Sequence, residues 1–388
     1  MVEVGERRAW IIAALVDAKL DAILCSASTE VLLLTGYWPV MSSCVAIHTA
    51  DGQVRLIVPK DEVEFAQKTS SARLIVYEPA GLNTLRSPLE QLRAPLQEAL
   101  EDLGLQKSSI GLQLGEGVQP SSYSVAYQFR SSLVDMLREL VPEGSFKPCD
   151  GLLDSLKAVK TAGELALIEK ACLVAAAAFV RAETIMTVGS RETDVAAAVQ
   201  SAFDTTPSAR HFERSYGYFF CMSGPNSAKA CAAFARTRNR KLEMGDLVMI
   251  HCNTCADGYW TDITRTYTVG APSDRHTEMR EAIMQARAAG FNAIRPGVAG
   301  CDVDRAVRDV MKAHGLGDAF KHASGHGVGF AAANPNGVPR IHPLSRDVLQ
   351  AGMTFNVEPA AYFDGYGGMR HCDVVAVTED GVKVLTQF

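Results

Sequence analysis

The run Asp262-Ile263-Thr264-Arg265-Thr266 is the most informative stretch of this sequence for its fold. It follows a turn at Asp257-Gly258-Tyr259 and belongs to a strand-like stretch that continues to Val269. An aspartate at the start of such a strand can project into a cleft as a metal ligand. Three short motifs follow: Gly325-His326-Gly327, Glu358-Pro359 and Arg370-His371-Cys372-Asp373. A carboxylate, an imidazole and a second carboxylate are what a metal-dependent hydrolase requires.

Composition bounds the class of protein. The chain has 388 residues, of which 47% are hydrophobic and 21% are charged, as is ordinary for a globular protein of two domains. The net charge of −6 argues against nucleic acid or an anionic membrane as the main partner. No long apolar stretch follows the first eight residues, so we expect neither a signal peptide nor a membrane-spanning helix, and a cytoplasmic location.

The ten cysteines are scattered along the chain, without the dense spacing of a disulfide scaffold. Cys252 and Cys255 form a C-x-x-C pair, but no second pair accompanies it as a structural zinc site requires. We therefore expect most of the cysteines to be free thiols that pack as small hydrophobic side chains.

Residues 1–150 are predicted to form a small α/β domain. Short apolar runs, which are interpreted as strands, alternate there with charged helical segments such as 86–104. The runs are Ala22-Ile23-Leu24, Val31-Leu32-Leu33-Leu34 and Leu56-Ile57-Val58. A break rich in Pro and Gly follows at 142–151, so residues 151–388 form the second domain.

The second domain is predicted to mix long helices with short strands. The helical patterns span 164–186, 191–203, 277–295 and 302–314, and the strand-like runs span 247–250, 263–269, 353–357 and 374–377. A faint repeat relates its parts, because five residues from Gly189 to Val199 recur at an offset of 108 in the stretch from Gly297 to Val307. A duplicated domain places a site between its halves.

Taken together, the motifs resemble those of the pita-bread family that contains methionine aminopeptidases, Xaa-Pro aminopeptidases, prolidases and creatinase. Gly258-Tyr259-x-x-Asp262-Ile263-Thr264-Arg265-Thr266 is similar to its most specific motif, His322-x-x-Gly325-His326-Gly327-Val328-Gly329 to its histidine motif, and Gly352 to Pro359 to its glutamate motif. Ser223 to Ala228 fits the Xaa-Pro branch, and Ala27 to Tyr37 resembles the creatinase-type N-terminal domain. The resemblance implies an α+β fold: a curved antiparallel sheet covered by helices, with pseudo-two-fold symmetry, after a smaller α/β domain.

The family holds two divalent ions with Asp, Asp, His, Glu and Glu, of which Asp262, His326 and Glu358 match here. His251 stands eleven residues before Asp262, where the first aspartate is expected, and Cys372 stands where the last glutamate is expected. His251 offers one nitrogen where aspartate can chelate, and a Cys372 thiolate favours Zn²⁺ or Fe²⁺ over Mn²⁺.

Two histidines that the family carries near the site are also replaced. Cys231 stands at the first position, after the Ser223 to Asn226 stretch, and Ala333 stands at the second. His342 is the nearest imidazole after Ala333, and the sequence leaves open whether His342 or Cys231 takes part.

Three readings of the site stay open. In the first, His251, Asp262, His326, Glu358 and Cys372 bind one or two divalent ions (Zn, Fe or Mn), which lower the pKa of a bound water. In the second, a creatinase-like hydrolase or a lyase acts on a small molecule by acid–base chemistry without metal. In the third, the protein binds peptides without catalysis. We favour the first, a metal-assisted, Xaa-Pro peptidase-like hydrolase of a peptide-like or small amide C–N bond.

The candidate catalytic residues are Glu358, His322 and Arg370. Glu358 would move protons, His322 begins the histidine motif, and Arg370 would clamp a substrate carboxylate or a ligand. Cys372 is alternatively a packed thiol without a role in the chemistry. We expect a small-molecule or short-peptide substrate, and the resemblance implies a homodimer.

Overall fold

The computed structural model describes residues 4–39, 43–79, 86–114, 130–206, 212–231, 236–331 and 337–388. The chain divides into two compact units, Met1–Lys157 and Ala158–Phe388. Ala333, one of the replaced histidine positions, lies outside the described residues. Within the described ranges, no helix is long and apolar enough to cross a membrane.

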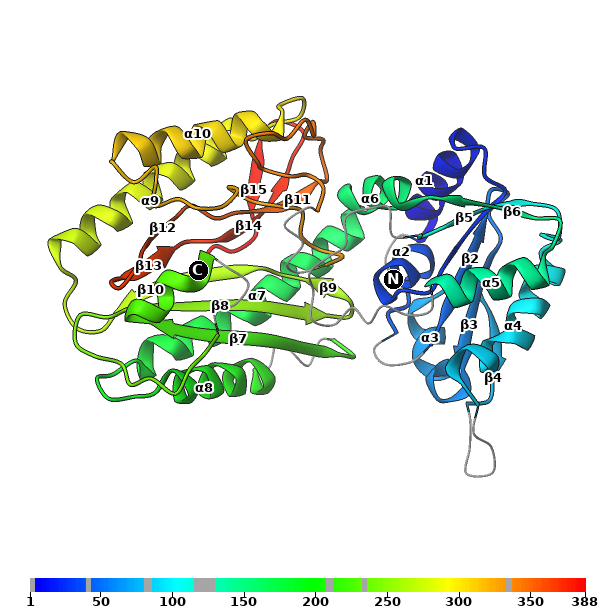
Figure 1. Ribbon diagram of the computed structural model, residues 1–388, viewed down its shortest axis with the longest axis horizontal. Helices are drawn as coiled ribbons and strands as arrows, with labels where there is room; N and C mark the ends of the chain where they lie inside the picture. The colour runs from blue at the N-terminus through cyan, green and yellow to red at the C-terminus, as the bar shows by residue number, and fades with distance from the viewer. Residues whose placement is uncertain are drawn as a thin grey trace. The chain divides into compact units, whose positions relative to one another are not determined.

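The first unit is built on a six-stranded sheet with the strand order β4-β3-β2-β1-β5-β6 (Figure 1). Its strands are β1 (Ala22–Cys25), β2 (Val45–Thr49), β3 (Val54–Pro59), β4 (Arg73–Tyr77), β5 (Ser109–Leu112) and β6 (Ser145–Pro148). Its helices are α1 (Val4–Asp17), α2 (Ser28–Thr35), α3 (Val63–Thr69), α4 (Pro88–Asp102), α5 (Arg130–Leu140) and α6 (Asp150–Ala158), with a 3-10 turn η1 (Lys60–Glu62). The sheet is mixed, because β1 pairs with β5 in parallel and with β2 in antiparallel.

The strand prediction at Val31-Leu32-Leu33-Leu34 is wrong, because this run lies in helix α2. All four side chains are buried, so the run shows no periodicity that separates a buried helix from a buried strand. The helix ends at Gly36, which adopts a left-handed conformation with φ of 76° and donates its N–H to the Leu32 carbonyl. That glycine was the available sign of a helix end.

The second unit contains antiparallel sheets only, among the strands that the structure describes. The first sheet has the order β10-β8-β7, with β9 paired to β8, and comprises β7 (Ser215–Ser223), β8 (Leu247–Ala256), β9 (Tyr259–Trp260) and β10 (Ile263–Thr268). The others are β11-β14-β15 and β12-β13, formed by β11 (Thr354–Val357), β12 (Ala360–Phe363), β13 (Gly367–Arg370), β14 (Asp373–Val377) and β15 (Val382–Val384).

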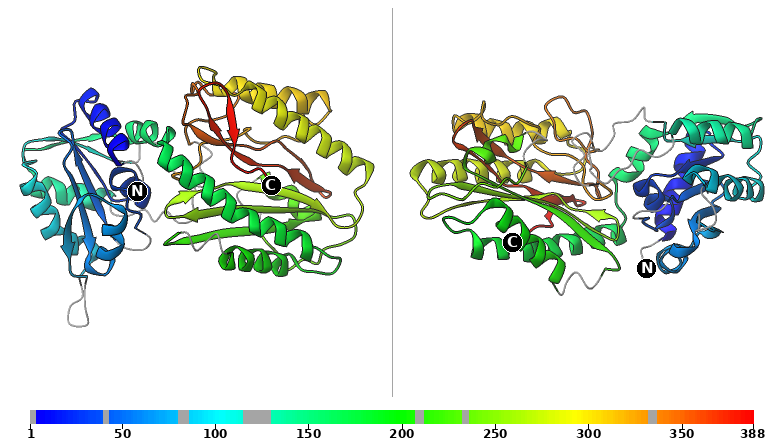
Figure 2. Two further views of the ribbon diagram at one scale, coloured as in Figure 1. Left: turned by 180° about the vertical axis from the view of Figure 1, so that it is seen from behind. Right: turned by 60° about the horizontal axis from the view of Figure 1, so that its bottom comes forward.

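Helices cover these sheets in two pairs. The pairs are α7 (Ala162–Ile185) with α8 (Glu192–Thr205), and α9 (Asp274–Ala293) with α10 (Gly300–Ala313); a 3-10 helix, η3 (Gly224–Cys231), follows β7. The first pair packs on β7 and β8, and α9 packs on β12 and β13 (Figures 1 and 2). Helices over antiparallel sheets are the predicted α+β architecture.

The repeat predicted at an offset of 108 is visible in the helices. Helices α8 and α10 both have 14 residues and start at Glu192 and Gly300, which are 108 positions apart. Gly189 and Gly297, which precede them, both have positive φ, at 89° and 86°. The two helix–strand units therefore enter their helices through the same turn.

Strand β10 connects the two halves of this unit. It pairs with β8 along one edge, and Thr264 forms an isolated bridge with Cys372 along the other. The Arg265 guanidinium spans the same junction, donating to the Cys372 carbonyl at 2.7 Å and to Asp373 Oδ1 at 2.8 Å. Asp262, which immediately precedes β10, is thereby held beside the C-terminal motif.

Candidate active site

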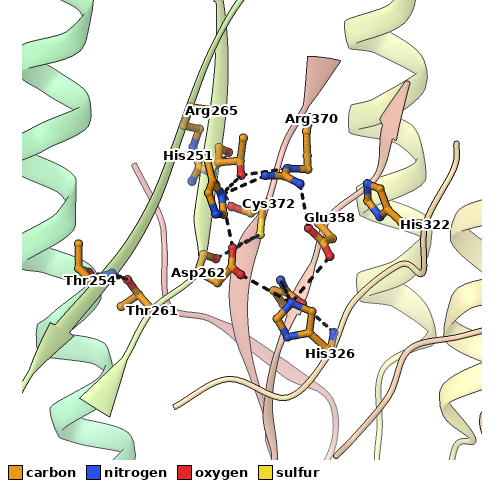
Figure 3. A network of polar contacts seen from close by, with 12 residues as sticks. His251, Thr254, Thr261, Asp262, Arg265, His322, His326, Glu358, Arg370 and Cys372 are labelled. Carbon is orange, nitrogen blue, oxygen red and sulfur yellow. Dashed lines mark hydrogen bonds and ion pairs between the residues drawn. The ribbon is translucent and has the colours of Figure 1, made fainter. Parts of the chain in front are cut away.

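The predicted site residues come together at the junction of β8, β10 and the segment after β13 (Figure 3). His251 lies on β8, directly opposite Thr264 of β10. The His251 Nδ1 atom lies 3.7 Å from Asp262 Oδ1, and Asp262 Oδ2 lies 3.6 Å from His326 Nε2. Residues separated by as many as 75 positions, 251 to 326, therefore share one buried cluster.

Two glycines fix the place of His326. Gly327 bridges Phe355 of β11, and Gly325 bridges Ile341. A Cβ at Gly325 would collide with the Asn356 carbonyl, and one at Gly327 with the Val338 carbonyl. Only glycine permits so close a backbone approach, so both flanks of His326 are pinned.

The hydrogen bonds of His326 assign its tautomer. Its Nδ1 lies 3.2 Å from the Gly327 carbonyl, which can only accept, so Nδ1 carries the hydrogen. Its Nε2 lies 3.2 Å from Asn356 Nδ2, which can only donate. Nε2 of His326 therefore carries no hydrogen and accepts from Asn356, which is the tautomer of histidines that bind metals through one nitrogen and donate the other to a carbonyl.

His326 Nε2 thus faces one oxygen of Asp262 and one of Glu358, with no hydrogen between these acceptor atoms. The His326 Nε2 atom lies 3.6 Å from Asp262 Oδ2 and 4.0 Å from Glu358 Oε1. All three side chains are buried. Opposed lone pairs in a buried place repel unless a cation lies between them.

A divalent ion suits this donor set. Two carboxylates and one imidazole are borderline-to-hard ligands, and three protein ligands with an open position are typical of catalytic zinc sites. Ligand atoms around such an ion lie about 3.4 Å apart if each bond is about 2.1 Å, slightly less than the separations of 3.6 and 4.0 Å. Among the described residues, no three His, Cys, Asp or Glu side chains are spaced to hold an ion as they stand, so the three side chains would have to close around it.

Arg370 occupies the other side of the site. Its Nε donates to Thr264 Oγ1 at 3.0 Å, its second terminal nitrogen lies 3.0 Å from His251 Nδ1, and its first lies 3.7 Å from Glu358 Oε2. Arginine nitrogens can only donate, so His251 Nδ1 is an acceptor and the hydrogen of this ring is on Nε2. Burial lowers the pKa of His251, Asp262 partly opposes this, and Arg370 lowers it further. His251 is therefore neutral.

Neighbouring charged and polar groups also determine whether Asp262 and Arg370 are ionised. Burial alone raises the pKa of Asp262, but His251, His326 and Arg370 outweigh it and hold this pKa below its ordinary value. For Arg370, burial lowers the pKa, but Tyr362 and Glu358, together with other acidic groups, raise it above its ordinary value. Both groups are ionised at neutral pH.

Cys372 is completely buried and points toward Asp262. Its Sγ lies 3.1 Å from the Asp262 carbonyl oxygen and 3.7 Å from Asp262 Oδ1. Burial, followed by Asp262 and Glu358, raises its pKa well above the ordinary value. In the absence of a metal ion the side chain is therefore a thiol that donates to Asp262.

His322 lies at the edge of the site. Its Nδ1 lies 2.8 Å from the Ala323 carbonyl and its Nε2 lies 3.0 Å from the Tyr362 hydroxyl. Because Nδ1 donates, the Tyr362 hydroxyl donates to Nε2. Burial lowers the pKa of His322, so this histidine is neutral and both of its nitrogens are engaged.

The two undecided residues have different surroundings. Cys231 is half-buried at the end of η3, with its Sγ 3.6 Å from the Ala228 carbonyl. His342 is exposed and accepts from the Leu344 N–H at 3.1 Å. All ten cysteines are free, and Cys252 and Cys255 are buried.

Sequence reasoning missed three residues of the site. Thr264 accepts from Arg370 and contacts His251, Asn356 orients His326, and Tyr362 orients His322. Thr264 lies within the first motif and Asn356 within the glutamate motif, so their places were marked although their contacts were not. Tyr362 lies outside every motif, so nothing in the sequence marks it.

Family models match both units. Residues 166–379 match the model described as metallopeptidase family M24, and residues 7–159 match the creatinase/prolidase N-terminal domain. The sequence is 32% identical over 266 residues to the Xaa-Pro dipeptidase of Pyrococcus furiosus, covering 66% of this chain and 71% of that relative. It is 27% identical over 380 residues to the Xaa-Pro dipeptidase of Pyrococcus horikoshii, covering 95% and 93%.

Solved structures agree with these matches. The prolidase from Pyrococcus furiosus superimposes with a TM-score of 0.77 at 28% identity, covering 97% of this chain and 99% of that chain. The Xaa-Pro dipeptidase from Bacillus anthracis gives a TM-score of 0.80 at 25% identity, covering 100% and 98%. The predicted pita-bread fold with a creatinase-type N-terminal domain is confirmed.

Proposed function

Because the chain belongs to metallopeptidase family M24, we propose that it hydrolyses a peptide-type C–N bond, with short Xaa-Pro peptides as the first substrates to test. The named relatives are Xaa-Pro dipeptidases, which supports this substrate class over the metal-independent and non-catalytic alternatives. Membership in this family implies a divalent metal ion.

The observation that carries the proposal is the set of three facing acceptors, Asp262 Oδ2, His326 Nε2 and Glu358 Oε1. We assign these three residues as the ligands of a divalent ion such as Zn²⁺, Fe²⁺ or Mn²⁺. When bound there, such an ion lowers the pKa of a water molecule and polarises the scissile carbonyl. Asp262 immediately precedes β10, Glu358 immediately follows β11, and His326 lies between two closely packed glycines, which suits a preorganised site.

The other side chains supply proton transfer and charge. Glu358 lies between His326 and Arg370, so its second oxygen is placed to take a proton from the attacking water and to pass it to the leaving amine nitrogen. In that step the water oxygen bonds to the carbonyl carbon, and the C–N bond breaks with its electron pair on nitrogen. His322 is neutral and is oriented by Tyr362, whose hydroxyl donates to its Nε2.

The test is hydrolysis by protein stripped of metal and reloaded with Mn²⁺, Zn²⁺ or Fe²⁺. The substrates are Xaa-Pro dipeptides, matched Xaa-Ala dipeptides and small amides, and the readout is release of the free amine. We expect Xaa-Pro cleavage that disappears with chelator. Asp262→Asn and His326→Ala should each lose activity on the order of 10²-fold or more, together with their metal.

Matched variants separate a loss of site from a loss of fold. Asp318→Asn and His314→Ala make the same chemical changes at exposed positions and should keep full activity. Turnover that survives the chelator would support the creatinase-like alternative instead. A folded protein with neither metal nor turnover on the whole panel would support peptide binding without catalysis.

We also propose that the protein is a homodimer, as the family resemblance implies. Light scattering coupled to size-exclusion chromatography measures the mass directly, against the 41.8 kDa of one chain. A single species at that mass over a wide concentration range would contradict this proposal.

A cytoplasmic location is a further proposal. It is supported by the ten free cysteines, since free thiols persist in reducing compartments. Cell fractionation followed by detection of the protein would test it, and recovery of the protein outside the cytoplasm would contradict it.

A further inference from the structure

We propose that the Arg370 guanidinium is the second cation of this site, so that the chain binds one divalent ion where the family resemblance implies two. This inference rests on the proposed function, because it concerns the same metal site. It is carried by an asymmetry between the two histidines beside Asp262: the unprotonated nitrogen of His326 faces carboxylate oxygens, whereas that of His251 faces the Arg370 guanidinium.

The acceptor side contains only lone pairs. Asp262 Oδ2 faces the unprotonated Nε2 of His326, which in turn faces Glu358 Oε1. Among the described contacts of these three atoms, one group offers a hydrogen. It is the Asn356 amide, whose Nδ2 lies 3.2 Å from His326 Nε2. A cation from solution would therefore offset the repulsion between the lone pairs on this side.

The donor side already contains its cation. Arg370 is buried and held from three directions, by Thr264 Oγ1 at 3.0 Å, His251 Nδ1 at 3.0 Å and the Glu358 carboxylate at 3.7 Å. Its backbone N–H also donates to Thr266 Oγ1 at 3.0 Å. These contacts hold the guanidinium within the site.

His251 cannot serve a second ion through the nitrogen that faces the site. Its Nδ1 lone pair accepts from Arg370 at 3.0 Å and contacts Thr264 Oγ1 at 2.9 Å. Because Thr264 accepts the Nε hydrogen of Arg370, its own hydroxyl hydrogen is free to point at His251. The imidazole is therefore an acceptor for two side chains instead of a metal ligand.

The neighbouring side chains on this side also present hydrogens. The Cys372 thiol lies 3.7 Å from Asp262 Oδ1. Asn253 lies two positions after His251 on β8, on the same face of the strand, and its side-chain amide contributes to lowering the pKa of Asp262. A second metal ion here would meet hydrogen-bond donors where it needs lone pairs.

The charge balance agrees with one ion. Asp262 and Glu358 supply two negative charges, against one positive charge from Arg370 and two from each divalent ion. One ion leaves an excess of one positive charge, which a deprotonated water can neutralise, whereas two ions leave an excess of three. Uncompensated charge of that size is not tolerated in a buried site.

The test counts metal ions and needs no substrate. Protein stripped with chelator is dialysed against Mn²⁺, and bound Mn is measured by elemental analysis while its electron paramagnetic resonance spectrum is recorded. We expect one Mn per chain with the spectrum of an isolated ion. The double variant His251→Asp with Cys372→Glu replaces the neutral groups by carboxylates and should bind two, with the spectrum of a coupled pair.

A matched double variant controls for added negative charge. His314→Asp with Cys301→Glu makes the same changes at an exposed and a half-buried position of the same unit, and should still bind one ion. Circular dichroism checks that both double variants are folded.

The possible failures are distinguishable. Two ions in the wild-type chain would overturn the role of Arg370 and leave the proposed hydrolase intact, whereas no ion in the wild-type chain would overturn the metal assignment itself. A folded His251→Asp with Cys372→Glu variant that still binds one ion would also overturn the inference. If that variant does not fold, the wild-type count decides alone.

Discussion

At the scale of single residues, the position of one hydrogen separates two histidines of the same site. His326 donates from Nδ1 to a carbonyl, so its Nε2 can bind a metal ion. His251 instead accepts a hydrogen bond from Arg370 at its Nδ1. The sequence places both imidazoles in the site but says nothing of their tautomers. These depend on contacts with residues up to 119 positions away, from 251 to 370.

The buried thiol of Cys372 leads to a prediction about reactivity. The thiolate is the nucleophile toward alkylating reagents, and burial raises the pKa of Cys372 well above its ordinary value. In native protein treated with iodoacetamide at neutral pH, Cys372 should stay unmodified, while the half-buried Cys231 and Cys301 react. Peptide mass spectrometry gives the rate at each position.

Denatured protein provides the reference, because all ten thiols should then react alike. Modification of native Cys372 as fast as Cys301 would show that it is a thiolate, and would return it to the set of metal ligands.

His48 on β2 leads to a prediction about pH. Burial lowers the pKa of His48 to about 4, although the Thr49 carbonyl near its Nδ1 partly opposes this. Between about pH 6.5 and 4 the unfolded chain therefore binds a proton that the folded chain refuses, so stability falls as the pH falls. The loss reaches about 3 kcal/mol at pH 4.

The variant His48→Phe removes this titration. Urea unfolding at pH 7 and at pH 4.5 should give a smaller difference in the free energy of unfolding for the variant than for the wild type. Equal differences would mean that His48 does not titrate in this way.

At the scale of elements, the start of helix α8 holds the end of strand β7 in place. The Glu192 carboxylate is buried and accepts from the Ser223 N–H at 2.6 Å, the Ser223 hydroxyl at 2.7 Å, Asn226 Nδ2 at 2.9 Å and the Arg238 N–H at 2.7 Å. One side chain thus satisfies four donors around the turn into η3.

Removing that carboxylate should be costly. Glu192→Ala leaves buried donors without a partner, which we expect to lower the free energy of unfolding by roughly 3–5 kcal/mol. The exposed Glu281→Ala on α9 should change it by about 0.5 kcal/mol or less. Chemical denaturation measures both, and equal effects would contradict the role assigned to Glu192.

Elements with clear periodicity were predictable from the sequence, and those without it were not. Helices α7 to α10 and strands β10, β11 and β14 fall where the patterns predict them, to within a few residues at the ends, and β8 starts as predicted but continues to Ala256 instead of ending at residue 250. Strand β7 was missed, because the aromatic and small residues of Ser215–Ser223 do not alternate strictly with polar ones. The run in α2 was misread because it is buried all round.

Only those site residues that lie in recognisable motifs were predictable from the sequence. Short motifs that resemble a family located Asp262, His326 and Glu358, which lie together. The sequence did not reveal that Arg370 binds His251 and Glu358, since a hydrogen-bond partner is a property of three-dimensional packing.

At the scale of the whole molecule, the two units should respond differently to metal. All three proposed ligands belong to the second unit, Ala158–Phe388, and an ion that binds only the folded state stabilises it by about 2.7 kcal/mol at 100 times its Kd. For a unit of this size that is a rise in Tm of roughly 5–10 °C. Differential scanning calorimetry with Mn²⁺ or with chelator should show the shift in the transition of this unit.

Two variants test whether the rise in Tm comes from the proposed site. Asp262→Asn should abolish the Mn²⁺-dependent rise, and Asp318→Asn should keep it. A rise of the same size in Asp262→Asn would mean that the ion binds elsewhere.

The glycines beside His326 limit how this protein can be diversified. Neither Gly325 nor Gly327 has a positive φ, so their backbone is one that any amino acid can adopt, and yet a single methyl group at either would meet a carbonyl oxygen. In a saturation library, even alanine should be eliminated at both positions. Variants selected for new substrates should instead carry changes at the half-buried aromatic positions of β7. Distantly related descendants of this chain should show the same contrast, with glycine retained at both positions while the aromatic positions of β7 vary.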